Sequence, residues 1–123
     1  MLQVQRWDAA RDGMLTAGRL RERFEAQGLW VSEVHLRAGA QEQTQPVEHD
    51  ALHVVLSGLL RVTIAGDSAI LASGDALFVP RGTAVGLEVV GSSPVVAYLA
   101  AFLPQGPHAS RASRQAAADQ IWR

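Results

Sequence analysis

Residues 58–82 read GLLRVTIAGDSAILASGDALFVPRG, and this series of short β-prone runs separated by glycine-containing turns constrains the fold more than any other feature. Glycine tolerates the positive φ of a tight turn, so Gly66-Asp67 predicts that runs 59–64 and 68–71 pair antiparallel. The same turn signal recurs at 73–75 and 80–82, at intervals of about 8 residues. This spacing is typical of an all-β sandwich or barrel and not of strands that alternate with helices.

Three runs, residues 52–56, 76–79 and 95–99, are apolar at nearly every position and therefore on both faces of a strand. Such a strand needs cover on both faces, so we expect the barrel to bury one face and another part of the molecule to bury the other. A second subunit would supply that cover, and on this ground we predict a homodimer.

Glycine, aspartate and proline residues recur here in the pattern of a known fold. Gly58 closes one strand motif, and Gly74-Asp75, Pro80 and Gly82 form a second. With these residues the region 28–102 resembles a single-domain member of the cupin superfamily. The resemblance implies an all-β fold, the double-stranded β-helix or jelly roll. It also implies a divalent metal held by two histidines, a glutamate and a third histidine, which many cupins use for dioxygenation or isomerisation.

The metal ligands that the resemblance implies can be checked position by position. Alternate strand residues lie about 6.6 Å apart on one face, close enough for two imidazoles to reach one ion at about 2.0 Å. Counting from Gly58 and Gly82, the ligand positions fall on residues that are neither histidine nor acid: Gln45, Val47, Ala51 and Val85. Only glutamine has a donor atom, and it is a weak oxygen ligand. We therefore expect neither a metal nor another cofactor.

The remaining histidines suggest a pocket of a different kind. His53 is expected inside the barrel, as a hydrogen-bonded structural residue, a ligand contact or a metal ligand. His49 lies in a polar run near the barrel mouth, about 13 Å from His53 along the strand, too far for one ion. The predicted pocket is apolar with a few polar groups. Its residues are Gln45, Val47, His49, Ala51, His53, Val55, Val85 and Tyr98.

Two segments flank the predicted barrel, which we place at residues 28–103 of a single structural domain. Residues 1–27 form an arm and a short amphipathic helix over 16–27, ended by Gly28, which is expected to cover an open edge or end of the barrel. Residues 104–123 form a helical tail capped by Ser110. The terminal apolar pair Ile121 and Trp122 needs burial, either on this barrel or on a partner subunit.

Composition excludes several functions. The chain has no cysteine and no lysine, so a thiol nucleophile and Schiff-base chemistry are both excluded. The net charge of −1 predicts no nucleic-acid partner, and the arginines at 19–23 and 111–114 are interpreted as solvated helix faces. No apolar run is long enough to span a membrane, and we expect a cytoplasmic protein.

Three functions remain open, and the sequence favours one without catalysis. The first is a metal-free cupin that binds or senses a small apolar or weakly polar molecule, or serves as an accessory protein. The second is a metal-independent enzyme of the epimerase type, with His53 or His49 as base, Tyr98 as acid, and Arg61 or Arg81 on a diphosphate. The third is a metal-dependent oxygenase or isomerase with a rearranged site.

Overall fold

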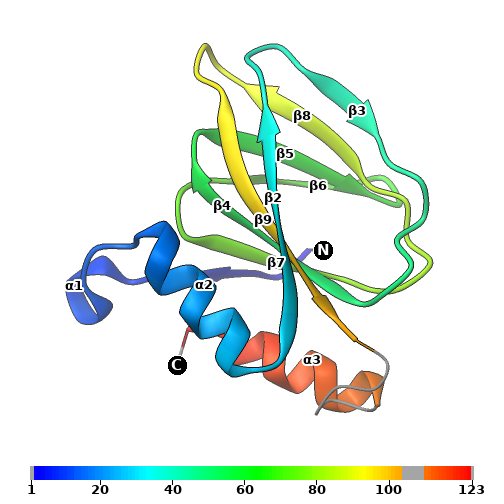
Figure 1. Cartoon of the computed structure of the whole chain (residues 1–123). Helices are drawn as coiled ribbons and strands as arrows, with labels where there is room; N and C mark the ends of the chain where they lie inside the picture. Colours follow the sequence, from blue (N-terminus) through cyan, green and yellow to red (C-terminus); the bar gives the residue numbers. More distant parts are fainter. Residues whose placement is uncertain (1, 104–109, 123) are drawn as a thin grey trace.

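The computed structural model describes residues 2–103 and 110–122, and within them the chain forms a two-sheet jelly roll with three helices (Figure 1). The five-stranded sheet has the order β1 (Val4–Arg6), β7 (Asp75–Val79), β4 (Ala51–Ser57), β9 (Val95–Phe102) and β2 (Leu29–Leu36). The four-stranded sheet has the order β3 (Gln41–Gln43), β8 (Gly86–Val90), β5 (Leu59–Ile64) and β6 (Asp67–Leu71). The helices are α1 (Ala9–Asp12), α2 (Ala17–Ala26) and α3 (Arg111–Asp119), and none of them is long and apolar enough to cross a membrane. The predicted all-β jelly roll is confirmed.

The β5–β6 hairpin shows how turn chemistry sets the register. Leu60 pairs with Leu71 and Ile64 with Asp67, so the predicted antiparallel pairing is confirmed. The two turn residues are Ala65 and Gly66, with φ of 51° and 87°. Two successive positive φ values are the requirement of the tight turns that match the twist of a hairpin. The turn therefore begins one residue earlier than the Gly66-Asp67 pair suggested.

Two separate hydrophobic cores explain why the central strands are apolar on both faces. Along β4, Val55 belongs to the core between the sheets, whereas Leu52 and Val54 belong to an outer core on the opposite face. The outer core also contains Leu20 and Phe24 of α2. The expected outside cover is therefore supplied by helices of the same chain. The homodimer stays a prediction. The apolar sheet face that suggested it is covered by the chain's own helices.

Helix α2 has the ends that its sequence predicts. The Thr16 side chain accepts a hydrogen bond from the Arg19 N–H at 3.2 Å, and Gly28 follows the helix with a φ of 74°. Leu20 and Phe24 lie one turn apart on the buried face. They pack on the outer face of the five-stranded sheet, and not on an edge or end of the barrel as expected, because that face is the large apolar surface available.

The C-terminal segment packs on its own barrel. Ser110 caps α3 by accepting from the Ser113 N–H at 3.1 Å, as predicted. Ile121 and Trp122 are buried in the outer core, and the Trp122 ring meets Trp7 edge to face with centroids 5.3 Å apart. Ile121 and Trp122 are therefore buried within one chain, and no partner subunit is needed to bury them.

Part of the N-terminal arm joins the barrel as a strand. Residues Val4–Arg6 pair with β7, and the Trp7 N–H donates to the Gly74 carbonyl at 3.0 Å. Gly74 has a φ of 87°, and a Cβ there would lie 2.6 Å from the Cβ of Trp7. A glycine is therefore required where the arm crosses the Ser73–Asp75 turn.

Candidate ligand site inside the barrel

The pairing register places His53 at the centre of the inner face of the five-stranded sheet. Its neighbours across the strands are Leu77 on β7 and Leu99 on β9, and Leu99 in turn pairs with Ser32 on β2. The next row towards the barrel mouth runs from Val79 through Ala51 and Ala101 to Trp30. Alternation puts both rows on the inner face, because the residues between them, such as Leu52 and Ala100, lie in the outer core.

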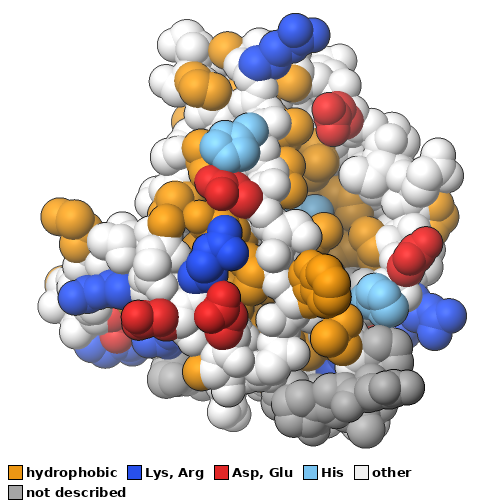
Figure 2. All heavy atoms as spheres, in the orientation of Figure 1, with side chains coloured by type: hydrophobic (Ala, Val, Ile, Leu, Met, Phe, Trp, Pro, Cys, Tyr) orange, Lys and Arg blue, Asp and Glu red, His pale blue; other side chains and the backbone are white. Residues whose placement is uncertain are grey.

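These two rows form one wall of a hollow that opens towards β2. Ala51 and Leu77 are buried, His53, Leu99 and Ala101 are partly exposed, and Ser32 and Trp30 are exposed. Ala51, Leu99, Ala101 and Trp30 belong to neither hydrophobic core, although all four are apolar. Figure 2 shows a hollow beside β2 that is walled by hydrophobic side chains.

The His53 imidazole is the one titratable group on these two rows. Its Nε2 atom is buried and has no hydrogen-bond partner among the described residues. Burial disfavours the charged form and lowers the pKa of His53 to about 4. The ring is therefore neutral at physiological pH, with one nitrogen able to donate a hydrogen bond and the other able to accept one.

Several residues of the predicted pocket lie in or near this interior. Ala51, Val55 and Val85 are buried, and Val55 and Val85 belong to the core between the sheets. Val47 packs against that core and is partly exposed. Gln45 is exposed to solvent in the segment after β3.

Tyr98 does not lie in the interior, contrary to the prediction. It pairs with Val54 and belongs to the outer core, where the guanidinium of Arg21 lies 5.5 Å from its ring centroid. His53 faces the other side of the sheet, so the proposed pair of a histidine base and Tyr98 as acid cannot meet one substrate. Arg61 is also directed elsewhere, because it pairs with Glu88 on the outer face of the four-stranded sheet.

His49 also differs from its expected position. β4 begins at Ala51, so His49 lies in a bend before the strand and does not share a strand face with His53. It is partly exposed.

The residues present do not fit the metal centre that the resemblance implied. Within residues 2–103 and 110–122 no group of three or more histidine, cysteine, aspartate or glutamate side chains is placed to hold a metal ion. His53 has leucines on both neighbouring strands, and the partner positions hold Gln45, Val47, Ala51 and Val85. A divalent ion needs several nitrogen, oxygen or sulfur donors at once, and this wall offers one.

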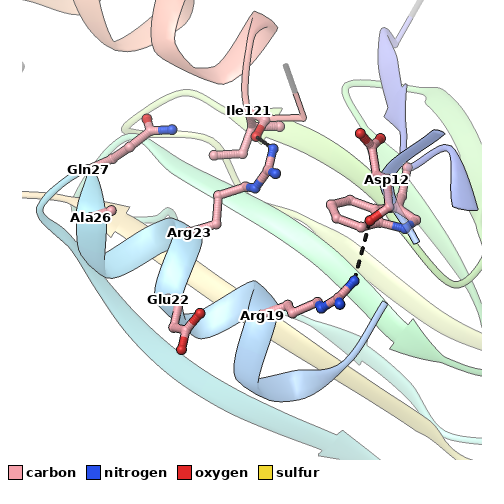
Figure 3. Close-up of a pocket in the computed structure, with 8 residues that line it drawn as sticks. Asp12, Arg19, Glu22, Arg23, Ala26, Gln27 and Ile121 are labelled. Carbon is pink, nitrogen blue, oxygen red and sulfur yellow. Dashed lines mark hydrogen bonds between the residues drawn. The ribbon is translucent and has the colours of Figure 1, made fainter. Parts of the chain in front are cut away.

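A second cavity, of about 580 Å³, lies between the α1–α2 region, α2 and Ile121 (Figure 3). Arg19 of α2 donates to the carbonyls of Asp12 and Met14 at 3.3 and 3.2 Å. Arg23 donates to the Ile121 carbonyl at 2.8 Å, and its guanidinium lies 5.2 Å from the Trp7 ring centroid. These contacts hold residues 7–14 and the C-terminal Ile121 against α2. We therefore interpret the polar side chains that line this cavity as structural.

The roles of these arginines were missed by sequence reasoning, which interpreted them as solvated. Arg23 is partly buried, and Arg114 of α3 is bound to Asp50, a buried carboxylate immediately before β4. The partners lie 98 and 64 residues away along the chain, so no local pattern could have identified them.

The comparisons with known proteins agree with this architecture. The family model described as a cupin domain matches residues 32–102. A solved protein of unknown function from Streptococcus pyogenes is 24% identical over 63% of this chain and 67% of its own, with a TM-score of 0.55. The cupin domain of an XRE family transcriptional regulator from Enterobacter cloacae is 22% identical over 64% of this chain and 86% of its own, with a TM-score of 0.55.

A DUF861 family protein from Thermotoga maritima is 16% identical over 83% of this chain and all of its own, with a TM-score of 0.54. At these identities the likeness to solved structures shows the fold alone. No protein of curated function matches the sequence. The family match, the glycine-bounded strands and the two-sheet barrel together show that the chain belongs to the cupin domain family.

Proposed function

We propose that this protein binds a small, uncharged molecule in the hollow beside β2, with His53 as the polar contact. One observation carries the proposal: the His53 ring is partly exposed between Leu77 and Leu99, and its buried Nε2 atom has no described hydrogen-bond partner. A buried polar group without a hydrogen bond costs about 1–3 kcal/mol of stability. A rotation of the partly exposed ring would turn Nε2 towards the hollow, and a ligand that then supplies the missing hydrogen bond recovers that cost.

The composition of the wall indicates the charge of the ligand. Among the eight residues of the two rows, only His53 and Ser32 are polar, and neither carries a charge at neutral pH. An ionised ligand would lose its hydration there without gaining an opposite charge. This wall therefore favours a neutral, largely apolar molecule with one hydrogen-bonding group, in keeping with the usual composition of small-molecule sites.

The proposal is tested by nuclear magnetic resonance of the His53 ring nitrogens during titration with a neutral amphiphile such as 2-naphthol. We expect a saturable shift of the ¹⁵N resonances and a matching rise in the melting temperature. His53→Leu removes both nitrogens and keeps a similar apolar volume, so it should weaken binding about tenfold, which corresponds to about 1.4 kcal/mol.

Ile70→Ala is the matched control, because Ile70 is exposed on the outer face of the four-stranded sheet. It should leave binding unchanged. Binding of equal strength in wild type and His53→Leu would contradict the role of His53. No binding of any neutral amphiphile would leave the chain as an accessory protein without a ligand.

A further inference from the structure

Trp30 occupies an unusual place for a large aromatic side chain. It is 63% exposed, and yet it lies on the inner face of β2, because its neighbours Leu29 and Val31 are directed into the outer core. A lone exposed hydrophobic residue on a convex surface needs no explanation. An exposed indole at the entrance of an apolar hollow is different, since it belongs to the wall that a ligand would touch.

The residues beside Trp30 leave its ring uncovered. Its cross-strand partner is Ala101, and the next residue along the same row is Ala51. Two alanines in succession provide little side-chain volume over a width of about 10 Å, because neighbouring strands lie about 4.8 Å apart. The indole is therefore not packed against a bulky inner-face neighbour in its own row.

The distance from Trp30 to His53 suits one small molecule. His53 is two strands away and one row deeper, which places the two Cα atoms about 12 Å apart. Both side chains project from the same face and the imidazole is partly exposed, so the ring of a ligand can touch the indole while its polar group reaches the imidazole. Leu99 and Ala101 lie between them and complete an apolar floor.

We propose that Trp30 is a stacking platform that selects planar ligands, and that the ligand class is a neutral one- or two-ring aromatic molecule with one hydroxyl or carbonyl group. This inference rests on the proposed function and adds the shape of the ligand to it. Aromatic rings stack in offset or edge-to-face geometry, and such pairs gain affinity beyond the area that they bury. A saturated ring of the same size lacks that interaction.

Three probes with one carbon skeleton separate the contributions of shape and polarity. They are 2-naphthol, its saturated form decahydro-2-naphthol, and naphthalene, which has no hydroxyl. Titration calorimetry on wild type should give the tightest binding for 2-naphthol. Decahydro-2-naphthol should bind at least about fivefold more weakly because it cannot stack, and naphthalene more weakly because it cannot bond to His53.

Substitutions at Trp30 then assign the preference to the indole. Trp30→Leu should remove the preference for 2-naphthol over its saturated form, whereas Trp30→Phe should keep part of it. His53→Leu should remove the preference for 2-naphthol over naphthalene and leave the preference for planarity. Because Trp30 is exposed, both Trp30 variants should fold, which unchanged far-ultraviolet circular dichroism would verify.

The outcomes distinguish the two proposals. If none of the probes binds wild type, ligand binding in the hollow is wrong and the role of Trp30 falls with it. If planar and saturated probes bind equally, and Trp30→Leu changes neither, only the stacking platform is overturned. If Trp30→Leu instead changes the oligomeric state measured by light scattering, with probe affinities unaltered, Trp30 contacts another copy of the chain and the stacking role is wrong.

Discussion

The carboxylate of Asp50 accepts a hydrogen bond from Nε of Arg114 at 2.6 Å, which ties α3 to the residue before β4. The Asp50 side chain is completely buried, and it also accepts from the Arg81 N–H at 2.6 Å and pairs with Arg111 at 3.2 Å. Burial alone would raise the pKa of Asp50. The hydrogen bonds from Arg81 and Arg114 and the charge of Arg111 more than offset burial, so its pKa lies below the usual value.

Arg114→Gln should destabilise the protein much more than Arg111→Gln. The Arg114 side chain is 18% exposed and that of Arg111 is 57% exposed, so only the first substitution removes a well-buried partner from a buried carboxylate. We expect a loss of about 3 kcal/mol for Arg114→Gln and less than about 1 kcal/mol for Arg111→Gln. Urea denaturation measures both, and equal losses would contradict this account of α3 docking.

Stability should fall as the pH is lowered from about 6.5 to about 4, because of His53. Its pKa is about 4 in the folded state and about 6.5 when unfolded, so between these values the unfolded chain binds more protons. The full effect is about 3 kcal/mol. In His53→Leu this decrease should be absent, whereas Asp50→Asn should retain it.

Asp50 affects a different pH range. Its folded pKa is depressed, so its stabilising contribution is present above its unfolded value of 3.8 and is lost as the pH falls through the lower folded value. Chemical denaturation at half-unit pH intervals separates the two groups. A flat profile between pH 4 and 6.5 in wild type would show that the His53 ring is solvated or hydrogen-bonded.

Trp122→Ala should cost about 3–5 kcal/mol, the usual loss for a buried aromatic side chain. The Trp122 ring packs against Trp7, and its centroid lies 6.2 Å from the centroid of the Phe24 ring. Its removal therefore opens the outer core below α2. Thermal unfolding with a hydrophobic dye measures both the loss and the newly exposed surface. Trp30→Ala, at an exposed position, is the control and should cost less than about 0.5 kcal/mol.

Gly58→Ala should be more destabilising than Gly66→Ala, although both residues have φ values near 88°. A Cβ at Gly58 would lie 2.5 Å from the Pro94 carbonyl oxygen, whereas at Gly66 no atom lies within 4 Å. Backbone strain alone costs about 1–2 kcal/mol, which is the expectation for Gly66→Ala. Gly58→Ala should cost at least about twice as much, and similar melting temperatures for the two variants would refute the steric argument.

Local chemistry accounts for what could be predicted from sequence. The β5–β6 hairpin and the ends of α2 follow from residues within a few positions of each other, such as Gly66 or Thr16. The glycine-bounded motifs indicated the cupin fold. Ala51, Val55 and Val85 are buried, and their role in lining a ligand pocket stays a prediction.

The wrong predictions concern residues whose strand face or distant partner cannot be read from the local sequence pattern. Tyr98 lies in a strand that is apolar on both faces, so alternation could not tell inside from outside. Trp30 was not included in the predicted pocket, because its place on the inner face depends on pairing with Ala101 across 71 residues of sequence. The signal available for Trp30 was its alternation with Leu29 and Val31, which are directed outwards.

Strands β4 and β9 have hydrogen-bonded neighbours on both edges, the barrel on one face and helices on the other. Their amide protons are held in hydrogen-bonded ladders on both edges, so most of them should exchange only when the sheet itself opens. In hydrogen–deuterium exchange these two strands should be the slowest to exchange, and their rates should report global unfolding. His53 and Leu99 lie on these strands, so the deep end of the hollow is built on the strands expected to open last, while Trp30 lies on the edge strand at its entrance.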